Sequence, residues 1–190
     1  VAETAALLRE DFGAGLLDLV KAFETVPHYI LVQVAIELGY PLVLLRLCLA
    51  SYRLKRSIGI EGVYSKLVVA MRGITAGSGT ATSELRLLLL ALMTEIQDRW
   101  ATKITVKLYV DDLTFALSGA PQKRVRFVIE VVDFVVDWLE RLLLMEVSAE
   151  KSQILAGKPS IAKAIAIGVA SQKLSAAAYA KLLGTDFVGG

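Results

Sequence analysis

The chain has 190 residues, enough for one domain with a substantial buried core. Hydrophobic residues make up 55% of the sequence, and the mean hydropathy of +0.59 is high for a soluble protein. The longest apolar stretch, residues 29–52, does not qualify as a membrane span, because a span needs about 18 or more uninterrupted apolar residues. The residues that interrupt it are Gln33, Glu37, Gly39, Pro41 and Arg46. We therefore expect a pair of buried helices here and no association with a membrane.

The net charge of +2 is unevenly distributed along the chain. Six of the seven charged residues between positions 40 and 75 are basic, and residues 151–190 carry five lysines against Asp186. The first 39 residues and the middle of the chain are net acidic. Basic segments that flank an acidic centre would suit a polyanion held next to a cation-binding site. The alternative is that both segments are ordinary solvated faces.

The single cysteine, Cys48, excludes an internal disulfide and a zinc site built from several cysteines. It lies in an apolar helical pattern, so we expect a buried, unreactive thiol. No signal or transit peptide is visible. The first residue is Val1 rather than a methionine, from which we expect a fragment or a processed product.

The first predicted element is a short buried strand over residues 14–20, which ends near Asp18. Pro27 then begins a helix that Gly39 ends, since proline favours the first helical position and glycine the position just past the last. A second helix is expected over residues 41–52.

Residues 57–71 predict a hairpin with its turn around Glu61 and Gly62. A loop rich in glycine and threonine, residues 72–84, then leads into a predicted helix of about four turns over residues 85–100.

Residues 103–110 alternate strictly between two faces, which is the pattern of a strand with one buried face. Ile104, Val106, Leu108 and Val110 form one face, and Lys103, Thr105, Lys107 and Tyr109 form the other. Two adjacent aspartates, Asp111 and Asp112, end this strand, and the chain returns at once as the apolar sequence LTFAL. Like charges side by side repel, so the pair costs stability unless a cation or a functional role compensates.

A long amphipathic helix is predicted from Pro121 to Met145, because its polar residues recur every three or four positions. These polar residues are Arg126, Glu130, Asp133, Asp137 and Glu140. A short strand pair around Lys151, a helix at 160–170 and a final strand near 180–190 complete the chain. Strands and helices mix without regular βαβ alternation, so the predicted fold class is α+β, an antiparallel sheet covered on one side by helices.

The strand-borne Asp18 and the hairpin-borne Asp111 and Asp112 form a candidate site for a hard metal ion. Magnesium prefers oxygen ligands and usually takes only one to three carboxylates, completing its shell with water and phosphates. Two such ions about 4 Å apart can drive an in-line phosphoryl displacement. The alternative from the residues alone is that Asp112 simply starts a turn.

Five segments, taken in order, resemble reverse transcriptases of the non-LTR retrotransposon and group II intron type. YVDD at 109–112 is similar to the family's signature, and DLVKAFETVPH at 18–28 resembles its DLSKAFDTVPH segment. GITAGSGTATSELRLLLL at 73–90 resembles the family's G-x-x-Q-G-S-P-x-S-P loop and the helix after it. VSAEKSQIL at 147–155 resembles its lysine-bearing segment, and AKLLGTDFVGG at 180–190 its primer-grip strand.

The resemblance implies a single, partial polymerase palm domain over residues 1–190, with the core palm at about 14–156 and residues 157–190 leading towards the primer grip. It implies an RNA-directed DNA polymerase that transfers a nucleotide from a dNTP to a primer 3′-hydroxyl, with RNA template and DNA primer as partners. The remaining polymerase domains of a longer parent protein are further implied partners. An intracellular location is expected, in the nucleus by resemblance, with an organelle as the alternative.

The resemblance also assigns roles to individual residues. Catalytic roles fall on Asp18, Asp111, Asp112 and Lys151. The ligands of two Mg²⁺ ions, for which Mn²⁺ could substitute, would be Asp18, Asp111, Asp112 and the carbonyl of Leu19. Nucleotide-binding roles fall on Leu19, Val20, Lys21, Ala22, Phe23 and Gly77. Phe23 would obstruct a 2′-hydroxyl, Lys151 would lie near the pyrophosphate, and the primer grip would include Leu183 and Gly184.

His28, the only histidine, matches the histidine of the family's VPH sequence, where we expect a structural role. A Ser-His-Asp triad and a zinc site with several histidines are not supported by this sequence.

The sequence departs from the family pattern in three ways. Ala76 stands where the family has glutamine, and Gly79, Thr80 and Ala81 replace its proline-containing run. Only 17 residues precede Asp18, and the chain ends just after the strand that resembles the primer grip. We therefore expect the fingers and the thumb to be largely missing and the isolated chain to have little activity.

Three alternatives remain open. The first is a non-catalytic remnant that binds nucleic acid weakly through its basic hairpin, which Ala76 favours and the retained aspartates disfavour. The second is an RNA-templated RNA polymerase, which Phe23 argues against. The third is an apolar interaction or membrane-associated protein, which predicts no binding of divalent metal ions.

Overall fold

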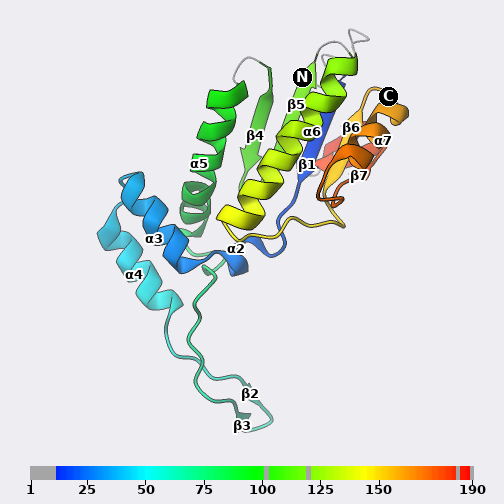
Figure 1. Cartoon of the computed structure of the whole chain (residues 1–190). Helices are drawn as coiled ribbons and strands as arrows, with labels where there is room; N and C mark the ends of the chain where they lie inside the picture. The colour runs from blue at the N-terminus through cyan, green and yellow to red at the C-terminus, as the bar shows by residue number, and fades with distance from the viewer. Residues whose placement is uncertain (1–11, 101–102, 119–120, 183–184, 189–190) are drawn as a thin grey trace. The chain divides into compact units, whose positions relative to one another are not determined.

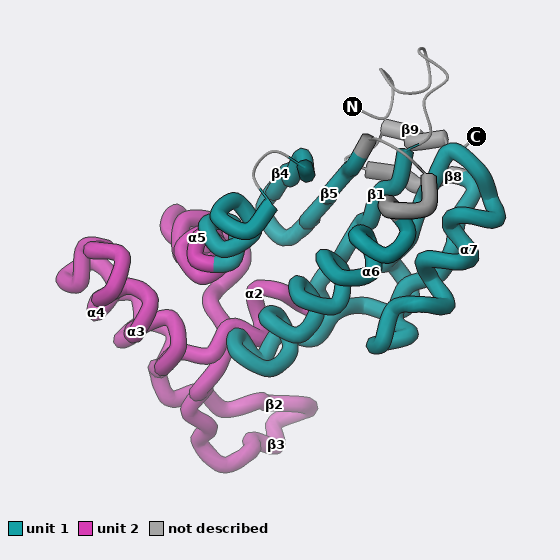
Figure 2. Tube along the Cα trace, turned by 45° about the horizontal axis from the view of Figure 1, so that its top comes forward, with its two compact units in different colours: residues 1–20, 92–190 teal, residues 21–91 magenta. Residues whose placement is uncertain are grey.

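The computed structural model describes residues 12–100, 103–118, 121–182 and 185–188 (Figure 1). The chain divides into two compact units, one formed by residues 1–20 and 92–190 and the other by residues 21–91 (Figure 2). Each unit is described by itself below.

A five-stranded sheet forms the centre of the first unit, in the order β4-β5-β1-β6-β7. The strands are β1 (Phe12–Leu17), β4 (Thr105–Tyr109), β5 (Asp112–Ser118), β6 (Gln153–Ala156) and β7 (Ser175–Ala176). All neighbouring pairs are antiparallel except β6 and β7, which are parallel. The predicted antiparallel sheet is therefore confirmed in its main part, and the parallel pair at one edge is a departure from it. All six residues of β1 are buried, as befits the central strand.

The close packing of β1 and β5 depends on a glycine. Gly15 lies opposite Phe115 in the antiparallel pair, and the Phe115 ring is fully buried. A Cβ at position 15 would overlap this ring, so the ring occupies the space that any other residue would need.

Two helices pack against the sheet in the first unit, and Figure 1 shows them on the same face of it. They are α6 (Pro121–Asp137) and α7 (Pro159–Gly168). The buried residues of α6 recur with helical spacing at Val128, Val131, Val132 and Val135, as the amphipathic pattern predicts.

The prediction of one long helix to Met145 is wrong at its C-terminal end. A π-helical turn, η1 (Trp138–Leu142), follows α6. Within it the backbone N–H of Leu143 donates to the carbonyl of Trp138, five residues earlier.

The predicted strand pair around Lys151 is also wrong, because residues 149–151 form a turn and β6 pairs with β1. The remaining strands of the first unit, β8 (Tyr179–Leu182) and β9 (Thr185–Val188), form an antiparallel hairpin near the predicted final strand. The predicted primer-grip residues Leu183 and Gly184 lie outside the described residues.

The second unit contains α2 (Ala22–Thr25), α3 (His28–Glu37), α4 (Leu42–Tyr52) and the first half of α5 (Ala81–Trp100). The two predicted helices, α3 and α4, are present: Pro27 and Pro41 immediately precede them, and Gly39 adopts φ 68° just past the end of α3. The expectation that both helices are buried is wrong for α4, in which only Leu45 and Tyr52 are buried. The helix predicted from residue 85 begins four residues earlier, at Ala81.

The predicted hairpin is confirmed as β2 (Gly59–Ile60) and β3 (Val63–Tyr64). Its two turn residues, Glu61 and Gly62, both have positive φ, which is the geometry of a tight two-residue hairpin turn. None of the described helices combines the length and the apolar character that crossing a membrane requires.

Candidate active site

A tight turn carries two of the three predicted carboxylates. Tyr109 at the end of β4 pairs with Asp112 at the start of β5, so that only Val110 and Asp111 connect the strands. Val110 has φ 57°, a left-handed conformation that is costly for a β-branched residue. Strain of this kind is typical of functional turns, and here it accompanies two adjacent, half-buried carboxylates at the tip of a hairpin.

Asp18 approaches the same turn from the neighbouring strand. In the antiparallel pair of β1 and β5, Leu17 lies opposite Leu113. Asp18 directly follows Leu17 and Asp112 directly precedes Leu113, so the two aspartates lie at the same end of the sheet. The predicted convergence of the three aspartates is therefore a consequence of strand pairing.

The electrostatics of Asp112 reflect this crowding. Burial is the largest cause that raises the pKa of its carboxyl, followed by the negative charges of Asp111 and Asp18, while Lys151 opposes the shift. Asp111 and Asp18 therefore both lie within electrostatic range of Asp112. Folding works against the ionised form of Asp112, as expected at a site where an additional cation would be stabilising.

Lys151 supplies part of the missing positive charge. Its ammonium nitrogen lies 3.5 Å from both carboxylate oxygens of Asp18. The Lys151 side chain is 68% exposed and that of Asp18 is 23% exposed, so the pair is a weak, solvent-screened one. The structure thus places Lys151 beside the carboxylates.

The backbone of Asp18 is held on both sides by the segment that carries Lys151. Its N–H donates to the hydroxyl of Ser152 (3.2 Å), and its carbonyl accepts from the N–H of Ser148 (2.9 Å). Both serines are buried. Sequence reasoning missed them, because nothing in the surrounding sequence VSAEKSQIL marks either serine as a partner of Asp18.

The donor set fits a hard divalent cation in its chemistry. Asp18, Asp111 and Asp112 offer only oxygen atoms, and the pKa of Asp112 is raised by burial and, after it, by the negative charges of Asp111 and Asp18. Among the residues that the structure describes, however, no three or more candidate ligands gather around a single point. Lys151 instead lies where a cation would neutralise Asp18.

A family model described as reverse transcriptase (RNA-dependent DNA polymerase) matches residues 4–185. The chain belongs to the reverse transcriptase family. The match spans nearly all of the chain, so the resemblance found in five separate segments is confirmed at the level of the family. Reverse transcriptases are RNA-directed DNA polymerases, a class of nucleotidyltransferase.

Two solved telomerase structures are similar to this reverse transcriptase chain. Apo telomerase from Candida tropicalis truncated from its C-terminal domain superposes with a TM-score of 0.65 at 12% identity, covering 98% of this chain and 38% of that one. Telomerase from the same organism, in complex with the TWJ fragment of telomeric RNA, superposes with a TM-score of 0.56 at 14% identity, covering 83% of this chain and 29% of that one. At these identities the likeness concerns the fold. No curated protein matches the chain.

The other residues that the reverse transcriptase resemblance singles out are divided between the units. Leu19 is buried in the first unit, and Val20 donates its N–H to the carbonyl of Glu146 (2.9 Å). Lys21, Ala22 and Phe23 belong to the second unit, where Lys21 has φ 48° and precedes α2.

The start of α2 is tied to the loop that resembles the family's glycine-rich loop. The carbonyl of Phe23 accepts from the N–H of Ile74 (2.8 Å), and a Cβ at Gly73 would come 2.9 Å from the carbonyl oxygen of Glu24. Gly77 has φ 84°, a conformation that side chains rarely adopt, and open space surrounds it. Glycine is therefore required at both positions for conformational reasons.

His28 has the predicted structural role. It is buried, and its Nε2 donates to the carbonyl of Gly73 (2.7 Å), which fastens the loop to the start of α3. Cys48 is half-buried rather than fully buried as predicted, and the pKa of its thiol is raised, mainly by burial, so the thiol stays protonated at neutral pH.

Ala76, the main departure from the family pattern, lines a cavity of about 270 Å³ beside the same loop. Arg56 and Arg72 line it as well, together with Glu24. Two arginines and no glutamine therefore line this cavity, and the Arg56 guanidinium donates to the carbonyl of Tyr52. Sequence reasoning noted these arginines only as part of a basic stretch.

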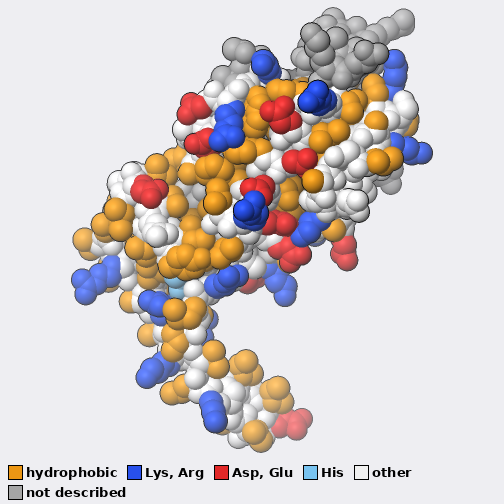
Figure 3. Space-filling model, in the orientation of Figure 1, with side chains coloured by type: hydrophobic (Ala, Val, Ile, Leu, Met, Phe, Trp, Pro, Cys, Tyr) orange, Lys and Arg blue, Asp and Glu red, His pale blue; other side chains and the backbone are white. Residues whose placement is uncertain are grey.

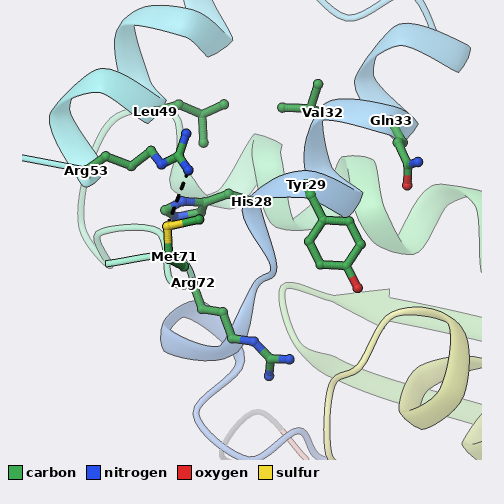
Figure 4. Close-up of a pocket in the computed structure, with 8 residues that line it drawn as sticks. All are labelled: His28, Tyr29, Val32, Gln33, Leu49, Arg53, Met71 and Arg72. Carbon is green, nitrogen blue, oxygen red and sulfur yellow. Dashed lines mark hydrogen bonds between the residues drawn. The ribbon is translucent and has the colours of Figure 1, made fainter. Parts of the chain in front are cut away.

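A second cavity, of about 430 Å³, lies between α3, α4 and residues 71–72 (Figure 4). Its lining is mostly apolar, and the guanidinium of Arg53 donates to the sulfur of Met71 across it (3.3 Å). Figure 3 shows hydrophobic side chains over the visible face of α3, α4 and the hairpin, with Lys and Arg between them. Exposed examples include Val43, Leu47, Val63 and Tyr64.

Proposed function

We propose that the chain is the palm of an RNA-directed DNA polymerase of the non-LTR retrotransposon or group II intron type. It would join a dNTP to the 3′-hydroxyl of a DNA primer on an RNA template. The observation that carries the proposal is that Asp18 and the adjacent pair Asp111 and Asp112 lie at the same end of the sheet, with Asp111 and Asp18 both within electrostatic range of Asp112 and Lys151 beside Asp18.

The three aspartates would bind and orient the cations of the reaction. Two Mg²⁺ ions, or Mn²⁺ in their place, would supply activation of the primer hydroxyl and neutralisation of the developing phosphate charge when bound. Asp18, Asp111 and Asp112 would provide carboxylate oxygens for them, and Leu19 its carbonyl. The strained turn at Val110 supports this role, since it holds two like charges together at a cost.

Lys151 would hold a proton at its ammonium nitrogen near the leaving pyrophosphate. At 3.5 Å from Asp18 it forms only a weak ion pair, so the Lys151 side chain would be able to turn from Asp18 towards the phosphates. In the free protein the Lys151 ammonium would neutralise part of the carboxylate charge. In the complex with cations and nucleotide it would donate a hydrogen bond to the phosphates.

Phe23 would select deoxyribonucleotides by obstructing a 2′-hydroxyl, with the neighbouring residues 19–22 and Gly77 contacting the nucleotide. The match of DLVKAF to the family's segment supports this assignment. The presence of Phe23 argues against an RNA-templated RNA polymerase.

A non-catalytic remnant is the second candidate, because Ala76 replaces the glutamine of the family in the loop at 73–80. The two arginines in the cavity beside Ala76 could still bind phosphate. The remnant would then bind nucleic acid without extending a primer.

A titration with Mg²⁺ or Mn²⁺ separates these candidates. The purified chain receives a short RNA–DNA primer–template and dNTPs, and metal binding and primer extension are followed together. We expect Asp111→Asn to reduce extension to the level of a reaction without protein and to weaken metal binding. Asp98→Asn, an exposed aspartate on α5, is the matched control and should behave as the wild type.

Each outcome of the titration has a distinct meaning. Extension by the wild type that the Asp111 variant loses supports the polymerase. Metal binding without extension supports a palm with intact carboxylates and insufficient hold on nucleic acid. Metal binding by neither protein would falsify the proposed role of the aspartates and favour the remnant.

A further inference from the structure

The backbone around Asp18 is held by a segment outside the sheet, residues 146–148. The N–H of Val20 donates to the carbonyl of Glu146 (2.9 Å), and the N–H of Ser148 donates to the carbonyl of Asp18 (2.9 Å). Leu19 and Val147 face each other between these two bonds as an isolated antiparallel bridge. The position of Asp18 therefore depends on where this segment lies.

The segment has a second, outward-facing side. Successive peptide groups of an extended chain point in opposite directions, so the N–H of Val147 points away from Leu19. A carboxylate oxygen of Glu140, Oε1, accepts from this N–H at 3.1 Å. Val147 is fully buried, so without Glu140 its N–H would lose this partner at a position from which water is excluded.

Glu140 reaches Val147 because the chain reverses directly after it. Glu140 is in the π-helical turn η1, and the N–H of Met145 donates to the carbonyl of Leu139 (2.8 Å). Leu144, between them, has φ 53°, a left-handed conformation that turns the chain back. This departure from regular helix brings residues 146–148 alongside the Glu140 side chain.

Lys173 fixes the Glu140 carboxylate in turn. Its ammonium nitrogen lies 2.7 Å from Glu140 Oε1 and 3.3 Å from Glu146 Oε1. The side chains of Lys173 and Glu140 are 27% and 29% exposed, less than in the surface ion pairs of the first unit such as Arg141 with Asp137. The hydrogen bond to Glu140 is the main cause that raises the pKa of Lys173, so the Lys173 ammonium stays charged at neutral pH.

We propose that Glu140, oriented by Lys173, is a positioning residue for Asp18. It holds Val147, and through the bonds of residues 146–148 it sets the backbone at Asp18–Val20 in the place that cation binding requires. The inference rests on the proposed function, because that function gives Asp18 its role.

Three variants test the inference. Glu140→Ala removes the acceptor and the charge, Glu140→Gln keeps an oxygen acceptor for Val147 and removes the charge, and Asp137→Ala removes an exposed carboxylate from the same helix as a matched control. Amide hydrogen exchange is measured at Val20, Val147 and Ser148, and the affinity for Mn²⁺ is measured in the absence of nucleotide.

We expect Glu140→Ala to speed exchange at these three amides at least about tenfold and to weaken Mn²⁺ binding by about tenfold, a loss of about 1.4 kcal/mol. Glu140→Gln should recover most of the exchange protection, and Asp137→Ala should match the wild type in both measurements. If Glu140→Ala does not fold, Lys173→Met takes its place and should weaken Mn²⁺ binding to a smaller extent.

Unchanged exchange and unchanged Mn²⁺ affinity in Glu140→Ala would overturn the inference. Faster exchange with unchanged affinity would also overturn it, because Glu140 would then only stabilise the chain reversal. A wild type that binds no Mn²⁺ at all overturns the proposed function instead, and the exchange data still decide whether Glu140 holds the backbone of Asp18.

Discussion

Asp112 is placed where folding works against its charge. Burial and the carboxylates of Asp111 and Asp18 raise its pKa above the ordinary value of 3.8, and Lys151 offsets only part of this. A carboxyl whose pKa is higher in the folded state binds its proton more tightly there, so its ionisation costs stability. That cost is present at neutral pH and vanishes when the group is protonated in both states.

Replacement of Asp112 by asparagine should therefore stabilise the metal-free protein at neutral pH. We expect Asp112→Asn to raise Tm at pH 7 by about 2–4 °C, the shift that about 1 kcal/mol produces in a chain of this size. The gain should fade as the pH falls through the raised pKa of Asp112 in the folded protein, and it should be lost below 3.8, where Asp is protonated even in the unfolded chain. Thermal unfolding in a chelator-containing buffer at several pH values measures it.

The exposed residue Asp98 supplies the control for this prediction, since Asp98→Asn should leave Tm nearly unchanged over the same pH range. A stabilisation by Asp112→Asn that persists undiminished at low pH would contradict the electrostatic explanation. It would mean that the asparagine gains a hydrogen bond or better packing rather than losing a repulsion.

At the scale of elements, the pairing of β1 with β5 sets the position of Asp18 relative to the hairpin turn. This pairing is close because Gly15 leaves room for the buried ring of Phe115. We expect Gly15→Ala to destabilise the protein by about 1–3 kcal/mol, the usual cost of overpacking a core. Chemical denaturation measures the loss.

Gly79→Ala is the matched control for the glycine in β1. Gly79 lies in the loop before α5, its φ is not positive, and open space surrounds it. Its replacement should change stability by less than about 0.5 kcal/mol. Equal effects of the two substitutions would show that chain entropy, and not the Phe115 ring, determines the cost at position 15.

Local patterns predicted most of the elements because their signals lie within a few residues. Proline before α3 and α4, glycine after α3 and the Glu61–Gly62 turn each act on the backbone next to them. The alternation up to Val110 predicted the hairpin that carries the aspartates in the same way. Local chemistry was therefore sufficient for these features.

Other features were not predictable from the sequence because they depend on distant partners. Ser152 holds the N–H of Asp18 across 134 positions, and no periodic pattern relates the two residues. The π-helical turn at 138–142 is followed by a chain reversal at Leu144, and leucine gives no sequence signal for the left-handed conformation found there. The two-residue parallel pair of β6 and β7 is too short to leave a pattern.

At the scale of the whole molecule, the two units carry opposite net charges. Residues 21–91 contain eight Lys and Arg against four Asp and Glu, a net charge of +4. Because the chain as a whole has +2, the remaining residues carry a net charge of −2. A polyanion is therefore attracted to the second unit, while the carboxylates of the first unit need a cation before they can approach phosphate.

Nucleic-acid binding should consequently depend on salt and on the arginines of the second unit. Arg56 and Arg72 line the cavity beside Ala76, where two guanidinium groups can contact phosphate. We expect the double variant Arg56→Ala, Arg72→Ala to bind an RNA–DNA duplex more weakly. The slope of log affinity against log salt should fall by about one to two, since each lost phosphate contact contributes about 0.9.

Fluorescence anisotropy at several salt concentrations measures this slope, and Arg86→Ala provides a control with a basic residue removed from an exposed position on α5. If binding were governed by net charge alone, each lost arginine would weaken it in the same way, and the effect per residue would match that of Arg86→Ala. A larger effect per residue in the double variant locates phosphate contacts at the cavity. Equal effects would assign the attraction to the unit's overall field and leave the cavity without a role in binding.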